Sequence, residues 1–262
     1  MTGRQEILVE GGADVGVLVL SGSSGRVETA RCRLLAEQGM TALSYRWFDG
    51  AVDRVPLESF EEPLATLHER CDRLAVLGTS RGAEAALLLG ALNPEIDAVV
   101  ALSPSDVAWA ALTTERPQRS SWTRRGEPLP FVPYDDDWTT EQEDGPIAFV
   151  ELYCQSLETY ADRVAAARIP VERIAGEVVV AAGEDDQLWP SVLFAEFIRR
   201  RRAAAGLATE VVTHPRAGHR VVLPGEEPLP PHAGRAYGGS DEADAELGAA
   251  VWPVLLRALR GS

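Results

Sequence analysis

Short apolar runs alternate with amphipathic segments along most of this chain. The runs are bounded by glycine, proline or polar residues and have the length of buried strands; they are Val15–Leu20, Thr41–Tyr45, Leu74–Leu77, Ala98–Leu102, Val178–Ala182 and Glu210–Thr213. The segments with apolar residues three and four positions apart, typical of helices, are Glu28–Glu37, Leu57–Arg70, Ala83–Leu92, Val192–Ala205 and Glu242–Leu259. This alternation predicts an α/β fold in which a mainly parallel sheet carries helices on both faces.

One region interrupts the alternation, from about residue 105 to residue 160. It mixes prolines, tryptophans, arginines and an acidic cluster without a clean period. Long irregular segments inside a compact domain usually cover or bind a ligand. We therefore expect a single domain over residues 1–262, with a lid-like insertion at 105–160 that contributes to a substrate pocket.

Charge and cysteine content exclude several classes of protein. The formal net charge is −15, which disfavours binding to nucleic acid or to an anionic membrane surface. The first residues do not resemble a signal peptide, and no apolar window approaches the length of a membrane span, so we expect a cytoplasmic protein. Three widely spaced cysteines, Cys32, Cys71 and Cys154, fit neither a disulfide framework nor a metal site. We expect no metal and no cofactor.

The stretch LAVLGTSRGAEAALLLG contains a serine between two glycines, at the point where a predicted strand turns into a predicted helix. Residues Gly78–Gly82 match G-x-S-x-G, the nucleophile elbow, which needs this strand–turn–helix setting. The glycines allow strand and helix to approach closely, and the helix N-terminus favours a developing negative charge. Ser80 is therefore the predicted nucleophile, and a helix-capping serine is the alternative.

A nucleophilic serine needs a base, and in hydrolases of this architecture the chain order is serine, acid, histidine. Of the four histidines, His219 lies in a glycine-containing loop just after the last predicted strand, where a base is expected. His214 at the strand end and His232 in PLPPHAG are alternatives. His68 precedes the serine, in a predicted helix, and we interpret it as a surface or packing residue.

The acid is expected in the loop after the preceding strand, which reads VVVAAGEDDQLWPS. Asp186 is favoured because it stands three residues after Gly183, and the loop must run about that far before a side chain points along the edge of the sheet. Asp185 is the alternative, and Glu184 is interpreted as part of an acidic loop.

An oxyanion hole needs two backbone N–H groups, one of them from the residue after the nucleophile, Arg81. The glycine-rich segment VLVLSGSSGRVE supplies the second, which we assign to Ser23, with Ser24 beside it as a substrate-binding residue. A phosphate-binding G-x-x-G loop is the rival interpretation, but the Walker lysine and the third Rossmann glycine are missing.

Several further motifs carry a family resemblance; they include VLVLSGSSGRVETARCRLLAEQGMTALSYRWF, LGTSRGAEAALLLG, IDAVVALSPSDVAW, GEDDQLWPS and AGHRVVLP. Together they resemble the C-terminal catalytic domain of the acyl-CoA thioesterase and bile-acid-CoA:amino acid N-acyltransferase family, related to dienelactone hydrolases. The resemblance implies an α/β-hydrolase fold with nucleophile, acid and base at Ser80, Asp186 and His219.

Two departures from the family pattern matter. Its better-known members carry an N-terminal β-sandwich domain, whereas here the first strand is expected within the first ten residues, so we expect no such domain in this chain. The amino-acid-conjugating members use cysteine as nucleophile, so Ser80 favours water as the acyl acceptor.

The sequence thus predicts a serine hydrolase that cleaves a small-molecule acyl thioester through an acyl-enzyme. The alternatives are a carboxylesterase, an acyltransferase, or a binding protein that uses the fold without chemistry. Trp122 and Trp189 are predicted substrate-binding residues. The other aromatic residues of the insertion are assigned either to an acyl pocket or to its own core: Phe131, Tyr134 and Trp138. Four arginines are assigned either to the phosphates of coenzyme A or to pairs with Asp135–Asp137 and Glu141: Arg116, Arg119, Arg124 and Arg125.

Overall fold

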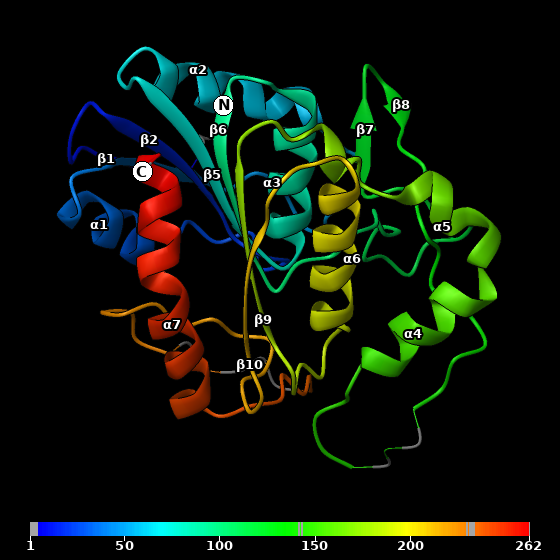
Figure 1. The fold of residues 1–262 in the computed structure, drawn as a ribbon. Helices are drawn as coiled ribbons and strands as arrows, with labels where there is room; N and C mark the ends of the chain where they lie inside the picture. The colour runs from blue at the N-terminus through cyan, green and yellow to red at the C-terminus, as the bar shows by residue number, and fades with distance from the viewer. Residues whose placement is uncertain (1–4, 141, 143, 229, 231–233, 262) are drawn as a thin grey trace.

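A seven-stranded sheet forms the centre of the molecule in the computed structural model, which describes residues 5–140, 142, 144–228, 230 and 234–261 (Figure 1). The strand order is β1-β3-β2-β5-β6-β9-β10, and every neighbouring pair is parallel except β1 with β3. The strands are β1 (Glu6–Val9), β2 (Val15–Leu20), β3 (Thr41–Tyr45), β5 (Arg73–Thr79), β6 (Ile96–Leu102), β9 (Glu177–Gly183) and β10 (Glu210–His214). The predicted mainly parallel sheet is confirmed.

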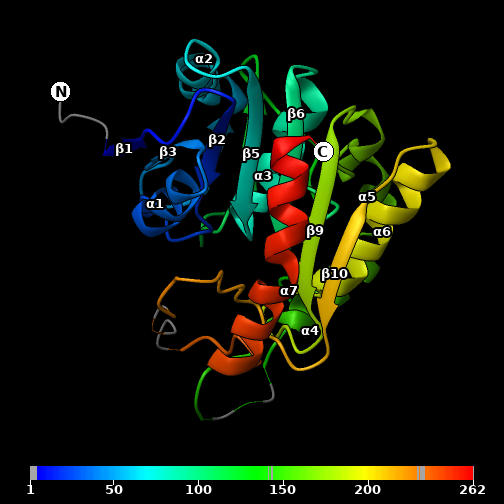
Figure 2. The same cartoon turned by 60° about the vertical axis from the view of Figure 1, so that its left-hand side comes forward.

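Helices cover both faces of this sheet, because the strand side chains alternate between two apolar cores. Val17 and Val19 point to the core formed with α1 and α7, whereas Leu18 and Leu20 point to the core formed with α2, α3 and α6. Figure 2 shows α7 lying along β6 and β9. The helices are α1 (Thr29–Glu37), α2 (Glu61–His68), α3 (Arg81–Leu92), α6 (Ser191–Ala204) and α7 (Asp241–Arg260). Within the described residues, no helix is both long and apolar enough to cross a membrane.

The 105–160 region is more ordered than its sequence suggested. Strands β7 (Trp122–Arg124) and β8 (Glu127–Pro128) join β4 (Val55–Pro56) in a small second sheet, followed by α4 (Val150–Thr159) and α5 (Ala161–Ala167). Elsewhere in the chain, η1 (Leu57–Phe60) and η2 (Val171–Arg173) are short 3₁₀ helices. The side chains of Trp109 and Trp122 are completely buried. The first half of the insertion is therefore part of the packed core.

Asp106, at the start of the insertion, is a buried carboxyl group with a remote cation. Its side chain is 3% exposed, and the closest guanidinium nitrogen of Arg201 is 4.0 Å away. Burial raises the pKa of Asp106 to about 6, and the charge of Arg201 offsets only part of this effect. The folded protein therefore binds this proton more tightly than the unfolded chain, whose aspartate pKa is about 3.9. The stabilising contribution is fully present below about pH 4 and is lost as the pH rises through about 6.

We expect the Asp106→Asn variant, which has no proton to lose, to gain up to about 3 kcal/mol in free energy of unfolding relative to the wild type between pH 4 and pH 8. Arg201 keeps its partner Glu172, at 2.6 Å, in this variant. Urea denaturation at several pH values measures the difference, with the exposed Asp162→Asn on α5 as the control. A constant difference between Asp106→Asn and the wild type over this pH range would contradict the prediction.

Candidate active site

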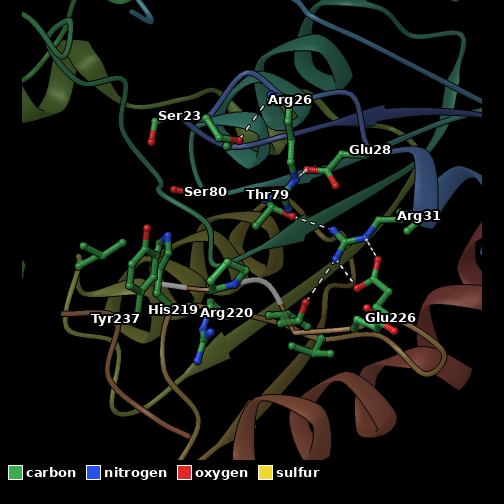
Figure 3. Close-up of a pocket in the computed structure, with 18 of the residues that line it drawn as sticks. Ser23, Arg26, Glu28, Arg31, Thr79, Ser80, His219, Arg220, Glu226 and Tyr237 are labelled. Carbon is green, nitrogen blue, oxygen red and sulfur yellow. Dashed lines mark hydrogen bonds and ion pairs between the residues drawn. The ribbon is translucent and has the colours of Figure 1, made fainter. Parts of the chain in front are cut away.

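Three parallel strands deliver the predicted catalytic residues to one edge of the sheet. Ser80 follows the last residue of β5, Asp186 lies three residues beyond β9, and His219 lies five residues beyond β10. The carboxyl ends of parallel strands meet at the same edge, which is where α/β folds bind ligands. Ser80 and His219 line the same cavity there (Figure 3).

Ser80 occupies a strained turn. Its backbone has φ +56° and ψ −120°, a combination that residues with a β-carbon rarely adopt. The flanking glycines are required by close backbone approach: a β-carbon on Gly78 would lie 2.0 Å from the carbonyl oxygen of Gly82, and one on Gly82 would lie 2.4 Å from that of Ser21. The strand, turn and helix therefore have the geometry of a nucleophile elbow.

His219 and Asp186 form a buried pair. The Nδ1 atom of the imidazole is 2.8 Å from Oδ2 of Asp186, and both side chains are almost completely inaccessible. The other carboxylate oxygen, Oδ1, accepts hydrogen bonds from the backbone N–H groups of Leu188 at 2.9 Å and Trp189 at 3.2 Å. These bonds fix the carboxylate, and the carboxylate in turn fixes the orientation of the imidazole.

The backbone and the ring of His219 are also held by neighbouring residues, of which the sequence had singled out only Trp189, as a substrate-binding residue. Its N–H donates to the carbonyl oxygen of Tyr237 at 2.8 Å, and its carbonyl oxygen accepts from the hydroxyl of Ser103 at 2.7 Å. The preceding residue, Gly218, donates its N–H to Asp244 at 2.8 Å. The rings of Trp189 and Tyr237 lie 5.6 Å and 6.1 Å from the imidazole. Ser103 directly follows β6, and this position after an apolar run is the sequence signal that could have placed it at the carboxyl edge of the sheet.

The other histidines are placed differently. His214 Nε2 is 3.0 Å from a carboxylate oxygen of Glu246 on α7, and its Nδ1 accepts from the N–H of Arg216. His68 is exposed near the end of α2. His232 lies outside the described residues.

The two acidic neighbours of Asp186 have other partners. Asp185 accepts from the N–H of Gly239 at 2.7 Å and from the side-chain amide of Gln187 at 2.8 Å. Glu184 accepts from the hydroxyl of Thr213. Of the three carboxylates in this loop, Asp186 is the one that contacts His219.

The loop after β2 lies against the nucleophile. A β-carbon on Gly22 would be 3.7 Å from Oγ of Ser80. Within the described residues, the N–H groups of Ser23 and Arg81 donate to no protein acceptor, so both are available to a substrate oxygen. Ser24 lines the same cavity. The rival phosphate-loop interpretation is disfavoured, because this loop faces Ser80 and α1 begins only at Thr29.

The cavity beside Ser80 has a volume of about 320 Å³. Its described lining comes from within residues 22–31, 79–80 and 219–237, with Leu188. Figure 3 shows Ser23, Ser80, His219 and Tyr237 on one side, and Arg31 and Glu226 on the other. Among the described residues, no group of three or more histidine, cysteine, aspartate or glutamate side chains is placed to hold a metal ion.

A buried arginine joins three parts of this wall. Arg31 on α1 bonds both carboxylate oxygens of Glu226, at 2.7 Å and 2.8 Å, and donates to the hydroxyl of Thr79 at 2.9 Å. Burial alone would raise the pKa of Glu226, but the charge and hydrogen bonds of Arg31 hold it below its ordinary value. No local sequence pattern reveals this pair, because its members are 195 positions apart.

The two tryptophans predicted to bind substrate do not line this cavity. Trp122 stacks on Trp47 and donates its indole N–H to Glu84 at 2.5 Å, so it is a core residue. Trp189 packs against the edge of His219 in a largely buried position. In the part of the chain that the structure describes, no residue of 105–160 lines the cavity.

The arginines of the insertion also lie outside this cavity. Arg116 pairs with Asp136, as one interpretation predicted, and Arg119 pairs with Asp53 and Glu115. Arg124 and Arg125 belong to the hairpin of β7 and β8. Their positions give no support to phosphate binding next to Ser80. Glu141 lies outside the described residues.

Comparisons with known proteins show which sequences and which folds this chain resembles. The family model "BAAT / Acyl-CoA thioester hydrolase C terminal" matches residues 55–260. Mitochondrial acyl-coenzyme A thioesterase 2 of Mus musculus is 27% identical over 225 residues, which are 82% of this chain and 47% of that protein. Bile acid-CoA:amino acid N-acyltransferase of Mus musculus is 27% identical over 220 residues, 80% of this chain and 49% of that protein. The chain spans about half the length of the curated relatives it matches.

Solved structures show the same architecture. A putative dienelactone hydrolase from Klebsiella pneumoniae superposes with a TM-score of 0.58 at 16% identity, covering 99% of this chain and 98% of that one. A Pyrococcus furiosus esterase superposes with a TM-score of 0.52 at 14% identity, covering 80% and 77%. The chain therefore has the α/β-hydrolase fold.

Proposed function

The chain belongs to the BAAT / acyl-CoA thioester hydrolase C-terminal family, and from this premise we propose that it is a serine hydrolase that cleaves an acyl thioester or ester. The observation that carries the proposal is the buried His219–Asp186 pair, because its histidine lines the same cavity as the strained Ser80. A structural role for these residues would not require a serine at a positive φ angle next to available N–H donors.

The reaction begins with the transfer of the Ser80 hydroxyl proton to Nε2 of His219, while Oγ attacks the acyl carbon. Asp186 holds Nδ1–H of the imidazole and stabilises the cation that forms. The N–H groups of Ser23 and Arg81 donate to the oxyanion. His219 then protonates the leaving thiolate or alkoxide, and water, activated by the same imidazole, releases the acid from Ser80.

We favour a thioester of the acyl-CoA type as substrate, because the relatives named above act on coenzyme A derivatives by name. The same catalytic groups cleave oxygen esters. Serine at the nucleophile position, with the pair His219–Asp186 behind it, supports hydrolysis rather than transfer to an amine.

The proposal is tested by labelling with a fluorophosphonate probe, which reacts with activated serine hydroxyls. We expect one labelled site, Ser80, identified by peptide mass analysis, and loss of labelling in Ser80→Ala. The matched control is Ser59→Ala, since Ser59 lies outside this cavity and its hydroxyl bonds the carbonyl oxygen of Pro56. Release of free thiol from acyl-CoA thioesters and of p-nitrophenol from acyl esters measures turnover. An unlabelled Ser80 together with no turnover of either substrate class would overturn the proposal in favour of a binding protein.

A further inference from the structure

The wall of the cavity beside Ser80 carries charged side chains of both signs. Four arginines and three glutamates of the described chain line it: Arg26, Arg31, Arg220, Arg235, Glu28, Glu226 and Glu227. Figure 3 shows several of them on the side of the cavity opposite Tyr237. Apolar atoms still make up most of the accessible surface of this wall, from side chains such as Val27, Leu188 and Val221.

One charged pair in the cavity wall, Arg31 with Glu226, is held firmly in place. The side chain of Arg31 is 6% exposed and that of Glu226 is 12% exposed, and they form a bidentate pair that also bonds Thr79. Separating a buried pair leaves an uncompensated charge in the protein interior. The cavity therefore does not widen on this side to admit a longer hydrocarbon chain.

Arg26 forms an accessible polar part of the same wall. Its Nε atom is 2.9 Å from a carboxylate oxygen of Glu28, and its side chain remains 45% exposed while that of Glu28 is 8% exposed. A guanidinium has five N–H donors, so this pair leaves donors that point to solvent or to a ligand. A hydroxyl or carboxylate on a substrate has the chemistry to accept them.

The aromatic side chains that would suit a long acyl chain lie in closed cores instead. Trp47 and Trp122 stack in one cluster, and Trp109, Tyr134 and Tyr153 pack in another. The cavity volume of about 320 Å³ is at the lower end of the range of ligand sites, about 300–1,000 Å³. Because the acyl group stays bonded to Ser80 after the leaving group departs, we assign it to the cavity that Ser80 lines.

We infer that the preferred acyl group is short and carries a hydroxyl or carboxylate that Arg26 binds. This inference rests on the proposed function, since it concerns the acyl group of that same reaction. It narrows the substrate class to small polar acyl esters and thioesters and excludes long unsubstituted fatty acyl chains as the best substrates.

The test compares kcat/KM for one leaving group and five acyl groups: butanoyl, 3-hydroxybutanoyl, succinyl, octanoyl and hexadecanoyl, as p-nitrophenyl esters. We expect the better of the two polar four-carbon esters to exceed butanoyl by about tenfold, the effect of one charge-assisted hydrogen bond. We expect octanoyl and hexadecanoyl to be cleaved more slowly than butanoyl.

The variant Arg26→Met replaces the donor by an apolar side chain of similar length. It should abolish the preference for the polar acyl group, through KM more than through kcat, because Arg26 does not contact the reacting atoms. The matched control is Arg33→Met, since Arg33 is an exposed arginine of the neighbouring helix α1 and does not line the cavity. The control should retain the wild-type ratio.

The possible outcomes separate the two proposals. Labelled Ser80 with fastest turnover of octanoyl or hexadecanoyl esters overturns the acyl-group inference and leaves the hydrolase proposal intact. Labelled Ser80 with a polar preference that survives Arg26→Met overturns the role of Arg26. An unlabelled Ser80 with no turnover of any ester overturns both.

Discussion

Replacement of Ser80 by alanine is expected to lower kcat by about 10⁴- to 10⁶-fold, the loss that follows removal of a triad nucleophile. In the proposed reaction, the oxygen of this hydroxyl becomes acylated. No neighbouring group replaces it. The N–H donors of Ser23 and Arg81 remain and sustain a small residual rate. Thiol release from an acyl-CoA thioester, or p-nitrophenol release from an ester, measures the effect.

A second substitution at the same position separates chemistry from folding. Ser80→Gly also removes the hydroxyl, but it relieves the backbone at φ +56°, so its free energy of unfolding should rise by about 1–3 kcal/mol. An inactive protein that is more stable than the wild type shows that the loss of activity is chemical. If Ser80→Ala retained wild-type turnover, the catalytic assignment would be wrong.

Replacement of Glu84 by alanine is expected to cost about 3–5 kcal/mol in free energy of unfolding. Glu84 is completely buried on α3, where its carboxylate bonds the guanidinium of Arg81 at 2.5 Å, the N–H of Trp109 at 3.1 Å and the indole N–H of Trp122 at 2.5 Å. The substitution leaves the equally buried Arg81 without its counter-charge and leaves two N–H donors without an acceptor.

Chemical denaturation measures this loss, and Glu95→Ala is the matched control, because Glu95 is exposed in the turn after α3. The conservative Glu84→Gln variant keeps an acceptor for the N–H donors and should lose less stability than Glu84→Ala. Because Arg81 is the proposed donor of an N–H to the oxyanion, we expect Glu84→Ala to reduce kcat as well. Equal stability of Glu84→Ala and Glu95→Ala would refute the structural role assigned to this pair.

Local patterns predicted the parts of the molecule that depend on local physics. The elbow around Ser80 was predictable, because close packing of a strand against the next helix requires glycine at positions 78 and 82, and both are visible in the sequence. Chain order then favoured His219 and Asp186. The structure places this histidine and this aspartate in contact, although their catalytic roles stay predictions.

The residues whose surroundings differ from the sequence prediction are those that contact distant parts of the chain. A tryptophan in an irregular segment has the same sequence signature whether it lines a pocket or fills a core, and Trp122 fills a core because Glu84 accepts its indole N–H. The helices α4 and α5 were missed because they are short and lie within a segment with no clean periodicity. The pairing of Arg119 with Asp53 spans 66 positions, which no local pattern reveals.

The guanidinium of Arg31 has a consequence for how the site responds to a substrate. It connects α1, the last residue of β5 and the loop beyond His219, through bonds to Glu226 and Thr79. Neither α1 nor the loop that carries Glu226 moves outward alone without stranding a charge in the protein interior. We therefore expect the proposed substrate to meet a preformed wall on this side, with selection among acyl groups by fit rather than by closure around the ligand.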